Sequence, residues 1–316
     1  MGQAVVKLHH EDLKTLQTRY QDQLVTKLPP GALFRAETSH CAITAYKSGK
    51  VLFQGKEAET EAAKWEGFAL GDASKKTKAS RKSTSVEHHA YTPPQNIADL
   101  SIIGSDEVGT GDYFGPLVVA AVFTKKEDAD FLRSLGVRDS KALTDERIGQ
   151  IAEAISKHVT HSLLVLHNEK YNALQESGYN QNKLKAVLHN QALMNVQNKL
   201  NEPFDGFLVD QFTTPNNYFK LLSDRNQVIN EKIYFKTKGE SVHLSVACAS
   251  ILARHRFVQE MDALSEKCGI LLPKGAGAHV DDVAARILKT QGEAALKKLT
   301  KFHFGNTEKA RKLARR

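Results

Sequence analysis

The chain has 316 residues, of which 41% are hydrophobic and 25% charged, a balance typical of a water-soluble globular protein with one or two domains. No apolar run approaches the roughly 18–20 residues that cross a bilayer, which excludes a membrane-spanning protein. The formal net charge of +8 and the pI of about 9.2 favour polyanionic partners, nucleic acid above all.

The ends of the chain and its cysteines indicate where the protein works. The N-terminal stretch "MGQAVVKLHHEDLK" lacks the apolar segment of a signal peptide, so we expect a cytoplasmic location. Cys41, Cys248 and Cys268 are odd in number and far apart, which is typical of reduced thiols. Residues 297–316 hold eight Lys/Arg and one Glu. They form either nucleic-acid-binding helices or a solvated basic tail.

Residues 1–66 are predicted to form a small unit that contains both helices and strands. Leu13, Leu16 and Tyr20 recur at helical spacing within residues 9–20. "ALFRAET" and "CAITAYKSGKVLFQG" read as strands, with a tight hairpin at residues 47–50, and "KEAETEAAKW" as a second helix. This unit has enough apolar residues for a modest core of its own.

Residues 67–97 differ in composition from both flanking zones. They are polar and basic, with almost nothing to bury, so burial cannot offset the entropy lost on ordering. We therefore expect a flexible basic linker, although an ordered loop on the main domain is the alternative.

From residue 98 onward, apolar strand-like runs give way to alternating strands and helices. Thr144 is a candidate N-cap for the helix that follows it. This order favours a mixed sheet with helices on its faces. The predicted strands are 100–107, 116–124, 161–167, 205–210 and 232–236, and the predicted helices are 145–159, 181–200 and 242–264.

Two adjacent acids, Asp106 and Glu107, stand inside the glycine-rich stretch "GSDEVGTGDYFGP". Neighbouring side chains of a strand point to opposite faces, so ideal geometry keeps these two apart. The flanking glycines permit either a bulge or an abrupt strand end. Burying two unpaired carboxylates costs several kcal/mol for each ion, and a divalent cation removes that cost. The alternative is a strand that simply ends in acids at the surface.

Two further acids follow predicted strands. Asp210 closes "FDGFLVD" and could be only a turn former, while Glu240 in "FKTKGES" could be only an acid that stabilises a helix N-terminus. Together the four acids are hard oxygen donors suited to Mg²⁺ or Mn²⁺. Such a set fits two-metal phosphodiester chemistry.

Two polar motifs complete the candidate site. Gly109, Thr110 and Gly111 would let the backbone approach a ribose 2′-OH, the group that separates RNA from DNA, or would form a tight turn with no ligand. Ser140 and Lys141, in the motif "DSK", offer a hydroxyl and an ammonium to a phosphate near a predicted helix start.

Taken in order, "GSDEVGTGDYFGPLVVAAVF", "DSKAL", "LVDQF" and "KGESVHLSVACASILAR" resemble the catalytic core of type 2 ribonucleases H, in the variant called ribonuclease HIII. The resemblance covers nearly the whole chain, including "AYKSGKVLFQGK". It implies an RNase H-like mixed sheet with flanking helices over residues 98–316, preceded over residues 1–66 by a small α+β domain similar to the TATA-binding protein.

The resemblance also implies an activity. An endonuclease would cut the RNA strand of RNA–DNA hybrids with Mg²⁺ or Mn²⁺, using two ions and leaving 3′-hydroxyl and 5′-phosphate ends. Separately from the resemblance, we expect a monomer. Asp106 and Glu107 match the first acidic pair of the family, and Asp210 its third carboxylate. Glu240 stands where type HII relatives carry Asp in "KGDS", which makes its assignment the least direct.

Gly109, Thr110 and Gly111 match the loop that reads the 2′-OH. The type HII enzymes have "GRG" there, and their Arg helps to recognise a single embedded ribonucleotide. Because this chain has Thr110 instead, the resemblance implies poor cleavage at lone ribonucleotides.

In the leading domain, the resemblance implies that one surface binds the hybrid. The residues concerned are Tyr46, Lys47, Lys50 and Gln54. A purely structural domain is the alternative. For the whole protein, two other functions stay open: a nuclease of the same fold that acts on another structured nucleic acid, and a non-catalytic nucleic-acid-binding protein.

Overall fold

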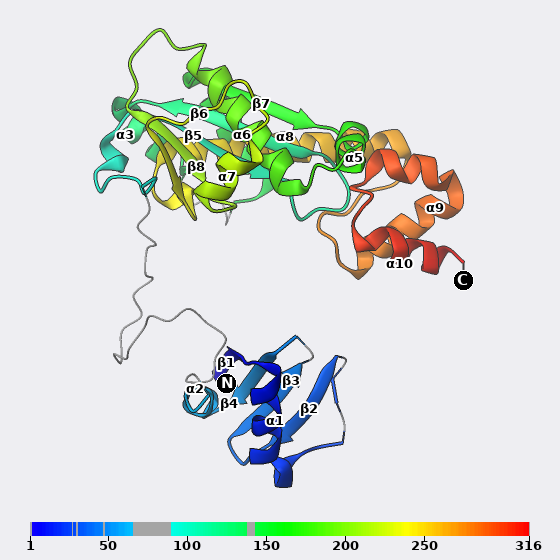
Figure 1. Cartoon of the computed structure of the whole chain (residues 1–316). Coiled ribbons are helices and arrows are strands. Elements are labelled where there is room, and N and C mark those ends of the chain that lie inside the picture. The colour runs from blue at the N-terminus through cyan, green and yellow to red at the C-terminus, as the bar shows by residue number, and fades with distance from the viewer. Residues whose placement is uncertain are drawn as a thin grey trace. The chain divides into compact units, whose positions relative to one another are not determined.

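The computed structural model describes residues 2–26, 28–29, 31–46, 48–65, 90–137 and 143–315. The chain divides into two units, residues 1–84 and 85–316 (Figure 1). Three predictions fall outside the described residues: the hairpin residue Lys47, the pair Ser140 and Lys141, and the linker over residues 67–89.

The first unit is a four-stranded antiparallel sheet, in the order β1-β4-β3-β2, with helices packed on one face. Leu13, Leu16 and Tyr20 are buried in its core, as the helical spacing predicts. The first strand was not predicted, because Val5 is 55% exposed while Val6 is buried, and two adjacent valines hide the period of two. The elements are β1 (Gly2–Lys7), α1 (His10–Arg19), η1 (Gln21–Gln23), β2 (Ala32–Glu37), β3 (Cys41–Tyr46), β4 (Lys50–Gly55) and α2 (Ala58–Ala63).

The second unit contains a five-stranded sheet in the order β7-β6-β5-β8-β9. Its elements are η3 (Ile97–Asp99), β5 (Ile102–Val108), β6 (Leu117–Thr124), η4 (Lys126–Asp128), α3 (Ala129–Ser134), α4 (Asp145–His158), β7 (His161–Leu166), α5 (Asn168–Glu176), α6 (Gln181–Gln197), β8 (Gly206–Asp210), α7 (Pro215–Leu221), β9 (Ile233–Lys236), η6 (Gly239–Ser241), α8 (Leu244–Cys268), α9 (Ala278–Leu299) and α10 (Gly305–Ala314). Each strand and helix predicted from the sequence in this unit is present.

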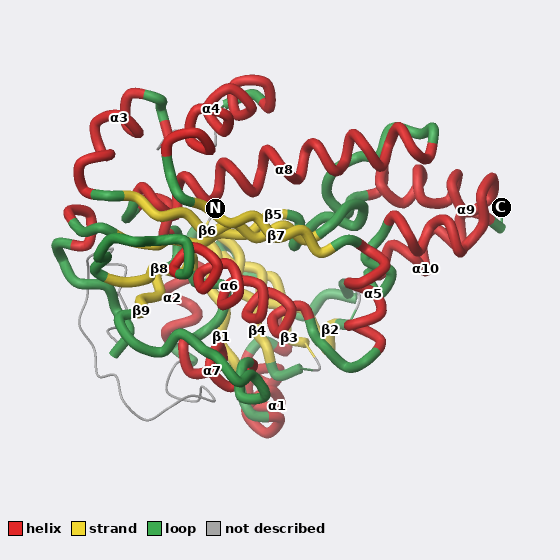
Figure 2. Tube along the Cα trace, turned by 90° about the horizontal axis from the view of Figure 1, so that it is seen from above, coloured by secondary structure: helices red, strands yellow, loops and turns green. Residues whose placement is uncertain are grey.

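Helices cover both faces of this sheet. Helix α8 runs along one face with α4 outside it, and α6 lies on the other face (Figure 2). Strands β5, β6 and β7 pair antiparallel, whereas β5, β8 and β9 pair parallel. Every residue of β6 is buried, as expected for a strand covered on both sides. The predicted mixed sheet with flanking helices is thus confirmed.

The ordered part of the second unit begins before residue 98. The ring of Tyr91 lies 5.1 Å from that of Phe219 and 6.0 Å from that of Phe235, measured between centroids. Ile97 is buried against Ile102. Residues 90–97, which the sequence placed at the end of the linker, therefore pack as part of this unit.

Most cations of the basic C-terminal segment are engaged within the fold. Lys297 pairs with Glu176, Lys309 with Asp281, and Arg311 with both Glu293 and Glu308. Exposed pairs of this kind contribute little stability individually. They nevertheless reduce the charge that this segment presents to a polyanion. Within the described ranges, every helix is too short or too polar to cross a bilayer.

Strand β5 lies unusually close to α8 at Gly104. A Cβ atom there would meet the hydroxyl oxygen of Ser245 at 2.2 Å and the backbone nitrogen of Val246 at 2.6 Å. Any side chain at this position would push α8 away from the sheet.

We therefore expect Gly104→Ala to lower the free energy of unfolding by about 1–3 kcal/mol, the usual cost of overpacking a core. Urea unfolding of the full chain measures this change. Gly305→Ala is the matched control, because a Cβ there would meet no described atom within 4 Å outside its chain neighbours and its own helix backbone. Equal stability of the two variants would show that β5 and α8 are not in close contact.

Candidate active site

The adjacent acids Asp106 and Glu107 lie near the end of β5, on opposite faces of the sheet. The pairing of β5 with β6 runs without a shift from Ile102 opposite Thr124 to Val108 opposite Val118. The bulge considered from the sequence is therefore not formed, and the strand simply ends after Val108. Normal alternation then directs Asp106 toward α8 and Glu107 toward α6.

Asp106 is buried on the α8 side of the sheet, with 8% of its surface exposed. Its Oδ1 accepts a hydrogen bond from the backbone N–H of Glu107 at 2.7 Å, and Ser250 of α8 also donates to its carboxylate. Burial raises the pKa of Asp106 well above its usual value, and the negative charges of Asp210 and Glu107 raise it further. None of these neighbouring groups is a cation, so hydrogen bonds are what oppose the effect of burial on Asp106.

Glu107 has an ammonium group and an imidazole around it on the α6 side. Lys185 Nζ lies 3.0 Å from its Oε1, and His189 Nε2 lies 2.9 Å from its Oε2. Burial alone would raise the pKa of Glu107, but the hydrogen bonds and charges of His189 and Lys185 outweigh it, and the pKa is lowered. The carboxylate of Glu107 is thus kept ionised.

The other two acids lie at the same edge of the sheet. Strands β5 and β8 run parallel with Ser105 beside Val209, so Asp106 and Asp210 each follow this pair. Burial, and then the charges of Glu240 and Glu107, raise the pKa of Asp210, although the N–H of Gly239 donates to its Oδ1 at 2.8 Å. Glu240 lies in η6, directly before α8. The structure therefore brings all four predicted acids into electrostatic contact.

This acidic group fits a divalent cation in its donor chemistry and in its charge. All four side chains offer hard oxygen atoms, and burial and neighbouring carboxylates raise the pKa values of Asp106 and Asp210, so they oppose the ionised forms of both acids. Among the side chains of the described ranges, no three His, Cys, Asp or Glu residues stand close enough together to hold a metal ion as they are. Glu107 is held on the α6 side of the strand instead.

The glycine loop follows the acids directly. Gly109 has a φ of 94°, and a Cβ there would meet the carbonyl oxygen of Pro116 at 2.2 Å, so only glycine fits. Gly111 is exposed and has no atom within 4 Å of a Cβ position. Gln181 donates to the carbonyl of Thr110 at 2.8 Å, and the buried hydroxyl of Thr110 has no hydrogen-bond partner in the described structure. The open side of this loop is thus at Gly111.

A buried lysine holds the far end of the loop. Lys301 Nζ donates to the carbonyl oxygens of Asp112, Gly115 and Pro116, at 2.9, 2.6 and 3.2 Å. The backbone N–H of Lys301 also donates to the carbonyl of Tyr113 at 2.8 Å. Tyr113 itself is fully buried, so its ring is not available for stacking on a ligand. This anchor could not be recognised from the sequence, because Lys301 lies among other basic residues.

In the first unit, the predicted substrate-binding residues share the outer face of the sheet. Lys50 and Gln54 are exposed and lie two pleats apart on β4, with Leu52 between them on the same face. Tyr46 at the end of β3 is half-buried, and the residue before it, Ala45, points into the core. This face therefore carries the three described residues of the predicted set, whereas Lys47 is not described.

The sequence did not identify Lys185, His189 or Ser250 as members of the site. Lys185 and His189 stand four residues apart in "KAVLH", a spacing that puts both on one helix face. Their positions opposite β5 follow only from the packing of α6 on the sheet. Ser140 and Lys141 stay predictions, because they are not described.

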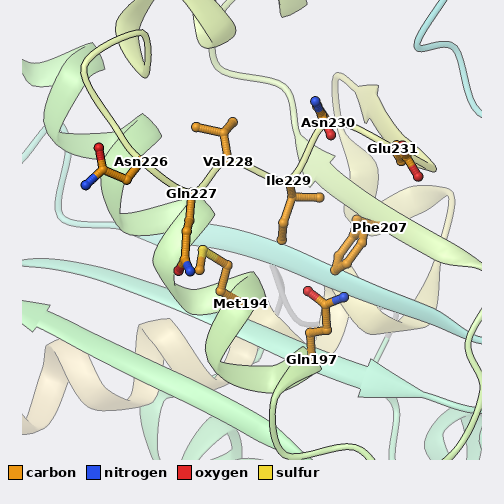
Figure 3. A pocket seen from close by; sticks show the side chains of 9 residues that line it. All are labelled: Met194, Gln197, Phe207, Asn226, Gln227, Val228, Ile229, Asn230 and Glu231. Carbon is orange, nitrogen blue, oxygen red and sulfur yellow. The ribbon is translucent and has the colours of Figure 1, made fainter.

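A separate cavity lies beside β8, between α6 and the loop at residues 226–231 (Figure 3). Its volume is about 400 Å³. The lining is mostly uncharged, with amide side chains and apolar groups, and includes none of the four acids. The lining residues are Met194, Gln197, Phe207, Asn226, Gln227, Val228, Ile229, Asn230 and Glu231.

Comparisons with known proteins match both units. A family model described as Ribonuclease HII matches residues 103–307, and one described as a domain of unknown function (DUF3378) matches residues 3–79. The ribonuclease HIII of Bacillus velezensis is 48% identical over 100% of this chain and 99% of its own length. That of Bacillus pumilus is 50% identical over 99% of each chain. The crystal structure of Bst-RNase HIII in complex with Mn²⁺ aligns over both full chains with a TM-score of 0.68 and 44% identity. These matches confirm the expected fold of both units.

Proposed function

The chain belongs to the ribonuclease HIII family, and we propose that it cuts the RNA strand of RNA–DNA hybrids by hydrolysis with two metal ions. The products would carry 3′-hydroxyl and 5′-phosphate ends. The observation that carries this proposal is the meeting of Asp106 and Asp210 at one sheet edge, with Glu107 and Glu240 acting on them. The glycine loop beside these acids supplies a means of recognising ribose.

The four acids would hold the cations. Burial and repulsion between carboxylates oppose the ionised forms of Asp106 and Asp210. A cation bound there would favour the ionised forms by compensating their negative charge. When bound, Mg²⁺ or Mn²⁺ would activate the attacking water and stabilise the leaving oxygen. The Mn²⁺ complex of the related Bst-RNase HIII supports this choice of cation.

The loop at Gly109–Gly111 would select RNA. Its backbone is exposed at Gly111, where no side chain of the described residues, apart from its two chain neighbours, comes within 4 Å of a Cβ position. A peptide N–H and C=O can respectively donate to and accept from a 2′-OH, which DNA lacks. The anchors at Asp112, Gly115 and Pro116 would keep this backbone in place while substrate binds.

Asp106→Asn removes one anionic donor from the proposed metal site and leaves the shape of the side chain nearly unchanged. Since metal ions stabilise transition-state charge by several kcal/mol, we expect hybrid cleavage to fall by roughly 10³-fold. Steady-state assays with Mg²⁺, Mn²⁺ or EDTA measure this, using hybrid, duplex DNA and duplex RNA as substrates.

Wild-type protein should cut the hybrid alone, and only with metal. Cleavage of duplex DNA would favour the alternative of a nuclease for another structured nucleic acid. Binding without any cleavage would favour a non-catalytic protein. Full activity of Asp106→Asn would refute the assigned site.

We also propose that lone ribonucleotides are poor substrates. The side chain at position 110 is a threonine whose hydroxyl is buried, so no long cationic group extends from the loop at this position. A DNA duplex with one embedded ribonucleotide should therefore be cut much more slowly than the same duplex with a run of ribonucleotides. Initial rates on the two substrates, at equal concentration, test this, and equal rates would contradict it.

The outer face of the first unit is the proposed second contact with the hybrid. Lys50→Ala should raise KM with little change in kcat, because a contact that does not involve the reacting phosphate contributes to binding alone. It should also lower the salt dependence of binding by about one counterion, as for a single phosphate contact. Lys64→Ala in α2 is the matched control, since Lys64 already pairs with Glu61. Identical KM values for the two variants would favour a purely structural domain.

A further inference from the structure

A buried polar group behind Glu107 joins the acidic site to α6. Both oxygens of the Glu107 carboxylate have a partner on this helix, Lys185 for Oε1 and His189 for Oε2. The exposed fraction is 7% for the side chain of Lys185 and 0% for that of His189. Two polar side chains are thus buried for contact with one carboxylate.

A second contact, made by the other ring nitrogen of His189, fixes the orientation of the imidazole. Its Nδ1 lies 2.8 Å from the hydroxyl oxygen of Ser105, a fully buried residue of β5. When the Ser105 hydroxyl donates to Nδ1, Nε2 carries the hydrogen and donates to Glu107. Ser105 and Glu107 lie on the same face of β5, so strand and helix are linked twice through one imidazole.

The ring of Phe212 closes this group from the other side. Lys185 Nζ lies 4.1 Å from the centre of the ring, and the His189 ring lies 5.1 Å from it between centroids. A cation over an aromatic face is stabilised where water is excluded. Lys185 therefore has two fixed partners, the Phe212 ring and the Glu107 carboxylate, and little freedom to move.

This arrangement treats the two adjacent acids differently. The groups that donate hydrogen bonds to Asp106 are a backbone N–H and a serine hydroxyl, whereas the partners of Glu107 are an ammonium and an imidazole from one helix. Of the two adjacent acids, Glu107 is thus the one whose two oxygens are both fixed in position by α6.

We propose that Lys185 and His189 are positioning residues that hold the Glu107 carboxylate ready for a divalent cation, and so set the affinity of the acidic site for metal. The inference rests on the proposed function, since it takes the acids to be the metal ligands. A carboxylate has about four lone-pair sites, so two hydrogen bonds leave others free. Outer partners that orient a ligand in this way typically contribute 10–100-fold to metal affinity.

The test is calorimetric titration of the full-length protein with Mn²⁺ alone, without nucleic acid. Lys185→Met and His189→Leu should each raise the dissociation constant for Mn²⁺ by roughly 10–100-fold. His189→Gln should stay close to wild type, because its side-chain N–H can still donate to Glu107. Lys183→Met is the matched control on the same helix, since Lys183 pairs with Asp224 instead. Thermal unfolding without metal shows which variants are folded.

Two results would overturn the inference. Tighter Mn²⁺ binding by Lys185→Met would show that the lysine only competes with the metal. Binding by folded His189→Gln that is as weak as that of His189→Leu would show that the hydrogen bond to Glu107 is not what matters. If His189→Leu does not fold, the test rests on Lys185→Met alone. A higher dissociation constant for Mn²⁺ would then support the inference, and a lower one would contradict it.

Failure of the proposed function would look different. In that case wild-type protein would not bind Mn²⁺, or Asp106→Asn would bind it as tightly as wild type. Cleavage assays of hybrid add a second readout, because the activity lost by Lys185→Met at low Mn²⁺ should be recovered at high Mn²⁺. An activity loss that no metal concentration reverses would also count against a role in metal affinity.

Discussion

The carboxylates at one edge of the sheet repel one another, and the contacts around them in the second unit depend on this repulsion. Asp106 lies near the end of β5 and Asp210 at the end of the parallel neighbour β8, and the charge of Asp210 raises the cost of ionising Asp106. A buried group of like charges is unstable unless hydrogen bonds, opposite charges or a cation compensate it. The protein supplies the first two only in part, through Ser250, the N–H of Gly239 and the side chains of α6. The remaining charge is what a cation would neutralise.

The geometry of strand β5 decides which helix supplies the partners of each acid. Because β5 stays regular to Val108, Asp106 and Glu107 face different helices, and no single helix can serve both. Helix α8 approaches closely enough to reach Asp106 only because position 104 is glycine. Helix α6 reaches Glu107 from the other face through Lys185 and His189. The helices on the two faces of the sheet therefore contribute side chains to the site, and they also form the hydrophobic core with the sheet.

The strands and the directions of the acids on them could be predicted from the sequence, because they depend on local patterns. The opposite directions of Asp106 and Glu107 follow from strand alternation, and the closing position of Asp210 follows from the apolar run before it. Lys185 and His189 could not be found in this way, since their partner lies 78 and 82 residues away in the chain. Helical spacing shows that they share a face but not what that face meets. Residues 90–97 were assigned to the linker for a similar reason, because the contacts of Tyr91 are with Phe219 and Phe235.

The basic C-terminal segment shows how a composition argument changes once contacts are known. Its excess of positive charge suggested a surface for nucleic acid, yet Lys301 lies fully buried among the carbonyls of the glycine loop. Burial lowers the pKa of Lys301 to about 7, whereas three carbonyl acceptors match the three N–H donors of the protonated amine. The amine of Lys301 is therefore used inside the protein, where its hydrogen bonds fix the loop that follows the acids. The short connection between α9 and α10 thus holds in place the loop that we propose contacts the ribose.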